Sequence, residues 1–264
     1  MNYTAPEMMT VAASRALRND DVCFVGIGLP SAACNLARLT HAPSVTLIYE
    51  SGTIGARPAV LPLSIGDGEL CETALTTVSV PEVFRYWLQG GRITVGFLSG
   101  AQVDRYGNLN STVIGSYVRP SVRLPGAGGA TEISAHCGRV FIVMQHSPRA
   151  FVEKPDFLTT LGHGPSGHER RQAGLVTDGP VLLVTDLCLM RPEPPTNEFV
   201  VTSLHPGVTR EHVRQKTGWD VRFSAELEET AQPLPSELEA LRDLNARSAK
   251  AHGGAGRAQQ RSAS

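Results

Sequence analysis

Apolar residues gather along the chain in short runs that glycine, proline and polar residues separate. Runs rich in β-branched and aromatic residues predict buried strands. They lie at residues 22–25, 45–49, 93–98 and 140–144, with a late pair at 181–185 and 199–201. Between them, apolar positions at helical spacing and flanking helix-terminating residues predict helices. These span residues 7–17, about 31–39, 81–88 and 209–217.

This alternation of strands and helices predicts an α/β fold, with a mostly parallel sheet flanked by helices. One large domain is expected over residues 1–230, and a separate C-terminal region over 231–264. Within that region, residues 236–250 have the charged, amphipathic pattern of a helix. Residues 252–264 consist largely of Gly, Ala, Gln, Ser and Arg, and we expect them to be disordered.

Glu50 is the leading candidate for chemistry, because it ends the strand at 45–49 and opens the turn Glu50-Ser51-Gly52. Open α/β sheets place their ligands beyond the carboxyl ends of the strands. Glycine lets the backbone approach a ligand or adopt a positive φ. The alternative is a structural carboxylate that caps a helix or pairs with an arginine.

A second glycine turn, Gly26-Ile27-Gly28-Leu29-Pro30, follows the strand at 22–25 and leads into a helix. Strand, glycine turn and helix together aim backbone N–H groups at anions. The turn lacks the G-x-G-x-x-G spacing of a dinucleotide site, so we exclude that function. It is either part of a ligand site or only a tight turn.

The amino-acid composition argues against several classes of binding partner. The chain is 41% apolar, its net charge is −1 and its pI is about 6.7, so nothing favours binding to nucleic acid or to an anionic membrane. No apolar stretch approaches the roughly 20 residues of a membrane-spanning helix. The N-terminus lacks the pattern of a signal peptide. We therefore expect a cytoplasmic protein.

Cysteine and histidine give no indication of a metal site. The five cysteines include no C-x-x-C pair, which argues against a disulfide framework or a zinc knuckle and favours reduced thiols. The eight histidines are scattered, and the spacing of His163 and His168 suits a metal poorly. We expect no metal.

Two further motifs define a family resemblance. Residues 99–112 contain the stretch Gly-Ala-Gln-Val-Asp-Arg-Tyr-Gly-Asn, and residues 126–129 form the loop Gly-Ala-Gly-Gly. With the Glu50-Ser51-Gly52 turn before them, these segments resemble, in the same order, the beta subunit of family I coenzyme A transferases, and the glutaconate CoA-transferase branch above all. The resemblance covers about residues 22–219. It implies the fold of the NagB/RpiA/CoA-transferase type.

The resemblance also implies roles for individual residues. Glu50 would be the nucleophile that forms a glutamyl-CoA thioester, and no cofactor would be needed because CoA esters are the substrates. Asn110, Gly128 and Gly129 would bind the thioester and stabilise the oxyanion. The loop at 126–129 could otherwise be a flexible surface connection. Further candidates for the loops that hold CoA or substrate are Gly26, Gly28, Ser51, Gly52 and Gly126.

The expected partners are an alpha subunit of comparable size, an acyl-CoA and a free carboxylic acid. Dicarboxylic and 3-oxo acids are candidates for that acid, and aromatic or branched-chain degradation products are equally open. Alternatives are a decarboxylase or hydrolase of CoA esters with the same fold, or a non-catalytic ligand-sensing module. Gln145 and His146 follow a strand and could line the pocket, although a structural histidine is an equal alternative. Basic residues near the motifs could meet the CoA phosphates, but none is assigned: Arg57, Arg105, Arg119, Arg123 and Lys154.

Overall fold

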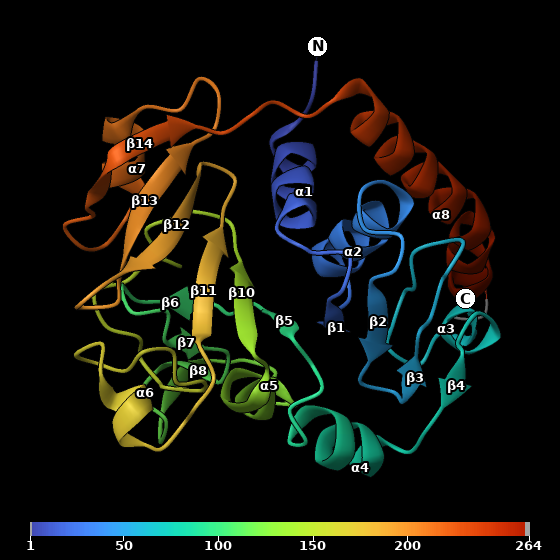
Figure 1. Ribbon diagram of the computed structural model, residues 1–264, viewed down its shortest axis with the longest axis horizontal. Coiled ribbons are helices and arrows are strands. Elements are labelled where there is room, and N and C mark those ends of the chain that lie inside the picture. Colours follow the sequence, from blue (N-terminus) through green and yellow to red (C-terminus); the bar gives the residue numbers. More distant parts are fainter. Residues whose placement is uncertain (1, 262–264) are drawn as a thin grey trace.

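The computed structural model describes residues 2–261 (Figure 1). Its centre is a ten-stranded sheet in the order β14-β13-β12-β11-β10-β5-β1-β2-β3-β4. The strands of this sheet are β1 (Val22–Val25), β2 (Thr46–Tyr49), β3 (Thr53–Ile54), β4 (Thr76–Thr77), β5 (Val95–Leu98), β10 (Arg139–Val143), β11 (Gly179–Val184), β12 (Cys188–Glu193), β13 (Glu198–Leu204) and β14 (Phe223–Glu229). Two small sheets pair β6 (Gln102–Val103) with β7 (Leu109–Asn110), and β8 (Val113–Gly115) with β9 (Pro120–Arg123).

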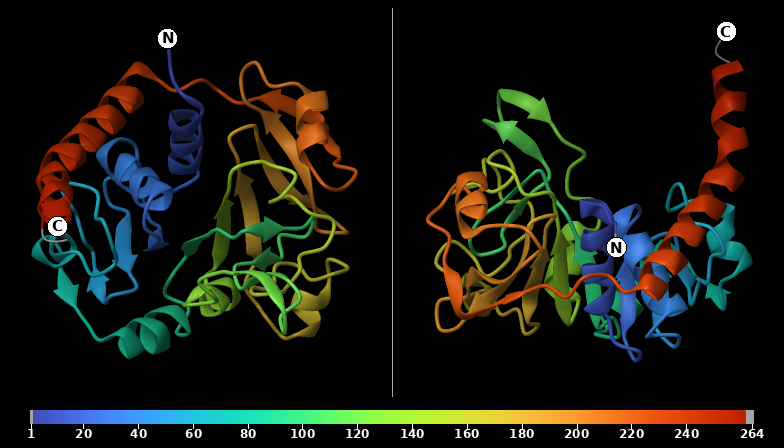
Figure 2. Two further views of the ribbon diagram at one scale, coloured as in Figure 1. Left: turned by 180° about the vertical axis from the view of Figure 1, so that it is seen from behind. Right: turned by 90° about the horizontal axis from the view of Figure 1, so that it is seen from above.

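Helices surround this sheet on both sides (Figure 2). They are α1 (Ala5–Arg15), α2 (Leu29–Leu39), α3 (Gly68–Glu72), α4 (Val80–Glu82), the π-helical turn η1 (Val83–Leu88), α5 (Ala130–His136), α6 (Glu169–Gln172), α7 (Arg210–Lys216) and α8 (Pro235–Arg261). The predicted strands are all present, and the four predicted helices match α1, α2, α4 with η1, and α7 within a few residues. Within the described residues, none of the helices combines the length and apolar composition needed to cross a bilayer.

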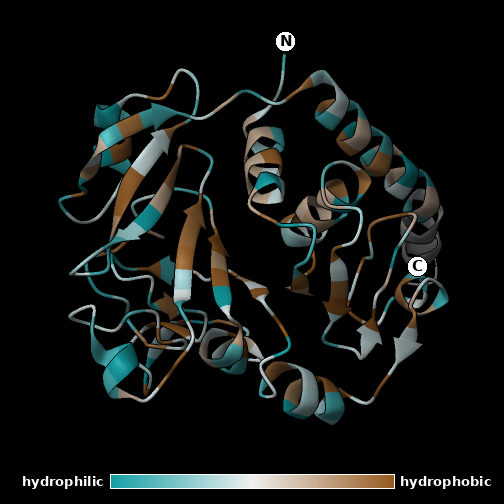
Figure 3. Ribbon diagram, viewed as in Figure 1, coloured by the Kyte–Doolittle hydropathy of each residue, from teal (hydrophilic) through white to brown (hydrophobic). Residues whose placement is uncertain are grey.

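The five central strands β11, β10, β5, β1 and β2 are mutually parallel, whereas β3, β4 and β12 pair antiparallel. Side chains alternate between the two faces of a strand. Phe24 and Ile48 join a core with η1 and α5, while Cys23 and Leu47 join a core with α1 and α2. Figure 3 shows hydrophobic residues concentrated on these strands. Burial of both faces explains their continuous apolar runs.

Strand order reverses between β1 and β5. The chain passes from β1 through α2 to β2 on one side, and later places β5 on the other side of β1. All five central strands run the same way, so their carboxyl ends share one edge of the sheet. Such a reversal leaves a crevice at that edge, which is where open α/β sheets bind ligands.

Two of the longer strands of the main sheet, β12 and β14, were not predicted from the sequence. The predicted late pair, β11 and β13, are not neighbours, because β12 lies between them and is antiparallel to both. Within β12, Arg191 and Pro192 interrupt the apolar pattern, and proline is uncommon in strands. The strand β14 is rich in glutamate and mostly exposed, so it lacks an apolar run. Tertiary pairing, and not local pattern, defines both strands.

The C-terminal region is one long helix, α8, from Pro235 to Arg261. Ion pairs attach it to α1, between Arg15 and Glu237 and between Glu7 and Arg242. The structure continues this helix through 252–261, where disorder was expected, and 262–264 lie outside the described residues.

Candidate active site

Glu50 lies at the carboxyl end of β2, in the turn that leads to β3. It is partly exposed, although β2 itself is buried. Among residues 2–261 its carboxylate forms no ion pair, so pairing with an arginine is not observed. The hydroxyl groups of Ser51 and Thr53 are buried beside it without a hydrogen-bond partner in the described chain. The turn therefore displays an unpaired carboxylate at the ligand-binding edge of the sheet.

Gly52 fixes the shape of this turn. Its φ is 110°, which L-residues rarely adopt, and an added Cβ would lie 1.9 Å from the carbonyl oxygen of Val78. The backbone N–H of Val78 in turn donates to the carbonyl oxygen of Gly52 at 2.9 Å. This contact holds the Glu50 turn against the segment between β4 and α4.

We expect Gly52→Ala to destabilise the fold strongly. Strain at a positive φ costs about 1–3 kcal/mol, and the clash with Val78 must be relieved by a backbone shift that adds to it. The matched control is Gly207→Ala, where φ is 81° but nothing lies within 4 Å of the added Cβ. Urea unfolding of both variants measures the two effects separately, because Gly207→Ala introduces only backbone strain whereas Gly52→Ala adds the clash with Val78. Equal losses of stability in the two variants would contradict the role of Val78.

The glycine loop at 126–129 meets Glu50 in space. An added Cβ at Gly129 would lie 2.9 Å from Glu50 Oε1 and 2.8 Å from Phe84 Cζ. Gly126 and Gly128 have φ values of 100° and 48°, and no atom lies within 4 Å of their added Cβ positions. The structure thus brings Glu50 and the Gly126–Gly129 loop together, although they are far apart in the sequence.

This loop also offers donors. The N–H of Gly126 is bonded to Ser111 O at 2.9 Å, and that of Ala130 to Ala127 O at 2.8 Å. Within the described chain, the N–H groups of Gly128 and Gly129 have no backbone or side-chain acceptor. Two unpaired backbone donors next to a carboxylate are the parts that an oxyanion site requires.

Asn110 was expected to supply a third donor, but its side chain is otherwise engaged. It is fully buried, and its Nδ2 group donates to Gln102 Oε1 at 2.8 Å and to Val113 O at 2.6 Å. The next residue, Ser111, donates its hydroxyl to Gly126 O at 2.8 Å. In this structure, Asn110 belongs to the scaffold that carries the glycine loop, and donation to a substrate would require it to break one of these bonds.

The neighbouring motif residues Asp104 and Asn108 also form scaffold. The carboxylate of Asp104 accepts from the backbone N–H groups of Tyr106 and Asn108 and from Asn108 Nδ2. Burial raises the pKa of this carboxyl group, and the hydrogen bonds oppose the rise. Asn108 Oδ1 accepts from Gly162 and Gly164. These contacts make Asn108 a structural residue of the turn.

Phe84 is a site residue that no sequence pattern indicated. It lies in the π-helical turn η1, contacts the Gly129 position and packs edge-on against Phe24 with ring centroids 6.0 Å apart. Such turns are often found at functional sites. An aromatic ring at this point lowers the local polarity beside Glu50. No motif pointed to it, because only tertiary packing places η1 there.

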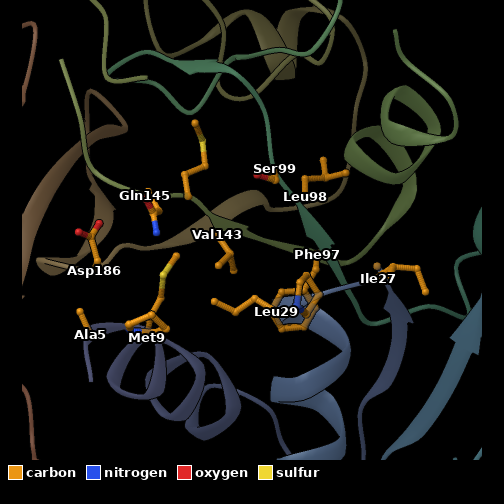
Figure 4. Close-up of a pocket in the computed structure, with 14 residues that line it drawn as sticks. Ala5, Met9, Ile27, Leu29, Phe97, Leu98, Ser99, Val143, Gln145 and Asp186 are labelled. Atoms are coloured by element: carbon orange, nitrogen blue, oxygen red, sulfur yellow. The ribbon is translucent and has the colours of Figure 1, made fainter. Parts of the chain in front are cut away.

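Gly26 and Gly28 lie at the same edge. Val25 pairs with Tyr49 in parallel register, so the chain leaves the two strands side by side at Gly26 and Glu50. Gly28 has a φ of 83° and precedes α2. A cavity of about 450 Å³ opens here (Figure 4), and Gly26 lines it. The second glycine turn therefore borders a cavity through Gly26.

Gln145 lines that cavity, whereas His146 is buried in the protein. The His146 ring stacks on Phe151 with centroids 3.7 Å apart and hydrogen-bonds Thr185 and Thr217. Burial lowers the pKa of His146 to about 3. Of the two alternatives, the structure supports the structural histidine.

This histidine predicts a loss of stability in acid. An unfolded chain protonates it below its ordinary pKa of 6.5, while the folded chain keeps it neutral down to about 3. Stability is therefore fully present above pH 6.5 and falls as the pH drops below it, by up to about 1.4 kcal/mol per pH unit. Urea unfolding between about pH 7 and about pH 5 should show a flatter dependence for His146→Gln than for the unaltered chain. Equal slopes would refute this assignment.

Two of the arginines near the motifs are already engaged by other side chains. Arg105 pairs with Glu153 and Glu198, so it is not free for a phosphate. Arg123 lies over the Tyr117 ring at 5.0 Å. Across the described residues no cluster of three or more potential metal ligands occurs.

Comparison with known proteins agrees with this geometry. Residues 6–216 match the family model described as coenzyme A transferase. The chain is 64% identical, over 95% of its length and 96% of the relative's, to the beta subunit of the 3-oxoadipate CoA-transferase of Pseudomonas knackmussii. It is 35% identical, over 92% of both chains, to the beta subunit of the glutaconate CoA-transferase of Acidaminococcus fermentans.

A solved structure leads to the same family. The crystal structure of the Acidaminococcus fermentans glutaconate coenzyme A-transferase superposes with a TM-score of 0.85 at 31% identity, covering 91% of this chain and 94% of the other. The NagB/RpiA/CoA-transferase type of α/β fold expected from the motifs is thereby confirmed. In sequence and in structure alike, this chain belongs to the coenzyme A transferase family, and its similarity is to the beta subunits of that family.

Proposed function

We propose that this chain is the beta subunit of a CoA-transferase that exchanges CoA between a thioester and a 3-oxo dicarboxylic acid, with Glu50 as nucleophile. The observation that carries the proposal is the position of the Glu50 carboxylate against Gly129, beside two unpaired backbone N–H groups. The acid class rests on the 64% identical relative, which is one subunit of a 3-oxoadipate CoA-transferase.

The first half of the reaction loads the enzyme. A Glu50 oxygen attacks the thioester carbonyl, the C–S bond breaks, and CoA leaves as a thiolate. The product is an anhydride between the acyl group and Glu50. The thiolate then attacks the Glu50 carbonyl carbon, and the first acid leaves as a carboxylate. Glu50 now carries CoA as a thioester.

The second half is the same sequence in reverse. The acceptor carboxylate attacks the glutamyl thioester and releases the thiolate, which then attacks the new acyl carbonyl and frees Glu50. Every bond broken is replaced by one of similar energy, so the exchange needs neither ATP nor a cofactor.

Each attack forms a tetrahedral intermediate with a negative oxygen. Fixed backbone donors stabilise such a charge without reorganising, and loss of one donor typically costs about 10²–10³ in rate. Gly128 and Gly129 fit this role because their N–H groups are unpaired and no side chain of their own shields them. Phe84, packed beside Gly129, limits the approach of water, which would hydrolyse the intermediate.

A second chain completes the enzyme. We assign the remaining substrate contacts to an alpha subunit. Both similar chains are the B subunits of their transferases, so each of those enzymes contains a further subunit. We also place the complex in the cytoplasm. All five cysteines are free, as expected in a reducing compartment.

Trapping the intermediate tests the proposal directly. The chain, co-purified with its alpha subunit, would be incubated with 3-oxoadipyl-CoA or succinyl-CoA without acceptor acid, then reduced with borohydride. Peptide mass spectrometry should locate the modification at Glu50, with activity lost in parallel. In the matched control Glu239→Gln, an exposed glutamate on α8 is altered and labelling at Glu50 should persist. An unmodified Glu50 in a complex that still consumes the CoA ester would overturn the mechanism.

A further inference from the structure

A second cavity lies at the amino end of β11, whereas Glu50 lies at the carboxyl end of β2. The central strands are parallel, so the two places are at opposite edges of the sheet. The cavity is bordered by α6, by the segment 174–178 that leads into β11, and by the turn between β12 and β13 (Figure 1). Its volume of about 530 Å³ is in the range of small-molecule sites.

Two arginines line this cavity, whereas the cavity beside Gly26 has no cation in its lining. The first, Arg170, is 3% exposed, and no ion pair to it occurs in the described part of the chain. Its guanidinium donates to Ser134 O at 2.8 Å, to Thr177 O at 3.1 Å, to Leu161 O and to the Thr177 hydroxyl. These acceptors are neutral, so they satisfy hydrogen bonds but leave a buried charge without a counter-charge. Such a charge is costly unless an anion pairs with it.

The remaining titratable groups of the lining do not cancel this charge. Arg171 is exposed and has no ion pair among the residues that the structure describes. Asp178 is the one acidic group of the lining, and it is exposed to water. His163 Nε2 donates to Pro180 O at 2.9 Å, and burial lowers its pKa, so the ring is neutral at physiological pH. The lining therefore carries two positive charges against one solvated negative charge.

The rest of the lining includes apolar groups. Leu175, Val176, Pro192 and Pro194 border the same space as the two arginines. Val176 is 96% exposed, so it offers apolar surface that no part of the described chain covers. Arginine binds a carboxylate through two parallel hydrogen bonds, and the apolar groups can pack against hydrocarbon. An inorganic anion would fill only part of the cavity and would leave this apolar surface in contact with water.

We propose that this Arg170 cavity binds a small organic carboxylate, with its head on Arg170 and Arg171 and its hydrocarbon body on the prolines and Leu175. The site is separate from the CoA exchange proposed at Glu50. It lies at the other edge of the sheet and contains neither Glu50 nor the glycine loop at 126–129.

A brominated carboxylate tests the location directly. Crystals of the assembled two-subunit complex would be grown with 4-bromobenzoate, and the anomalous scattering of bromine would give its position. We expect bromine in the Arg170 cavity, with the carboxylate beside Arg171. Bromine found only at the Glu50 edge of the sheet, or an alpha subunit that fills the cavity, would overturn the proposal.

A charge reversal tests binding in solution. Arg171→Glu alters an exposed side chain, and the matched control Arg18→Glu makes the same change in net charge at an exposed arginine outside the cavity. Arg170 is left intact, because it also holds α5 through Ser134 O. Calorimetry on the two-subunit complexes measures the Kd for 4-bromobenzoate and for inorganic phosphate, and thermal unfolding shows that both variants remain folded.

We expect Arg171→Glu to weaken 4-bromobenzoate at least about tenfold, a difference of about 1.4 kcal/mol, and Arg18→Glu to leave its Kd nearly unchanged. Phosphate should bind more weakly than 4-bromobenzoate to the unaltered complex. Equal losses in the two variants would show that only long-range charge matters. Phosphate binding as tight as that of 4-bromobenzoate would show that the hydrocarbon body is not recognised. Either result would overturn the proposal, and neither bears on the labelling of Glu50 by borohydride.

Discussion

Replacing Glu50 with glutamine should abolish CoA exchange while leaving the protein folded and assembled. The amide keeps the size of the side chain but cannot attack a thioester, so we expect kcat to fall at least about 10⁴-fold. Stability should change little, because the carboxylate is partly exposed and forms no ion pair within the described residues. The measurement is steady-state exchange by the two-subunit complex, together with size-exclusion chromatography and thermal unfolding.

A second variant sharpens this test. Glu50→Asp keeps the charge but withdraws the carboxylate by one methylene, away from the position beside Gly129. We expect intermediate activity, because a misplacement of about 1 Å can cost about 10²-fold. Substantial turnover in Glu50→Gln, equal to that of the Glu239→Gln control, would show that the carboxylate is not the nucleophile.

Adding a single methyl group at Gly129 should also cause a large loss of activity. The backbone there has an ordinary φ of −82°, so alanine introduces no conformational strain. Its Cβ, however, would lie 2.9 Å from Glu50 Oε1 and 2.8 Å from Phe84 Cζ. The carboxylate or the ring must move, and access to the Gly128 and Gly129 N–H groups narrows. We expect kcat to fall by about 10²–10³, the range typical for loss of one oxyanion donor.

The matched control for this change is Gly68→Ala at the start of α3, where no atom lies within 4 Å of the added Cβ. Both variants should unfold at nearly the same temperature as the unaltered protein, and only Gly129→Ala should lose activity. If Gly129→Ala instead raised KM with kcat unchanged, the loop would act in binding and not in stabilising the intermediate.

Local patterns were sufficient to predict the central strands of the sheet and the candidate nucleophile. The runs at residues 22–25 and 45–49 are apolar at nearly every position because both faces of β1 and β2 are covered, and such continuous runs can be recognised without a structure. The place of Glu50 follows from the same run, because a polar residue directly after a buried strand emerges at the sheet edge.

Contacts between distant residues could not be recognised in this way. The motif containing Asn110 indicated an active-site donor, yet hydrogen bonds to Gln102 and Val113 engage it as support for the glycine loop. No sequence pattern indicated that Phe84 lies at the site, because an aromatic residue in a helical segment gives no information about which loop it will contact.

Periodicity, turn chemistry and motif order are properties of short segments, and they were enough to predict the α/β fold, the transferase family and the position of Glu50 at the end of β2. Three other features appeared only in the folded molecule: Glu50 and Phe84 both lie against Gly129, β12 separates β11 from β13, and a cavity without cations opens at the strand reversal. These features depend on which elements pack together and on which hydrogen bonds are already formed. The burial of side chains and the pairing of polar groups across the whole fold determine the packing and the hydrogen bonds, and no short segment of sequence specifies them.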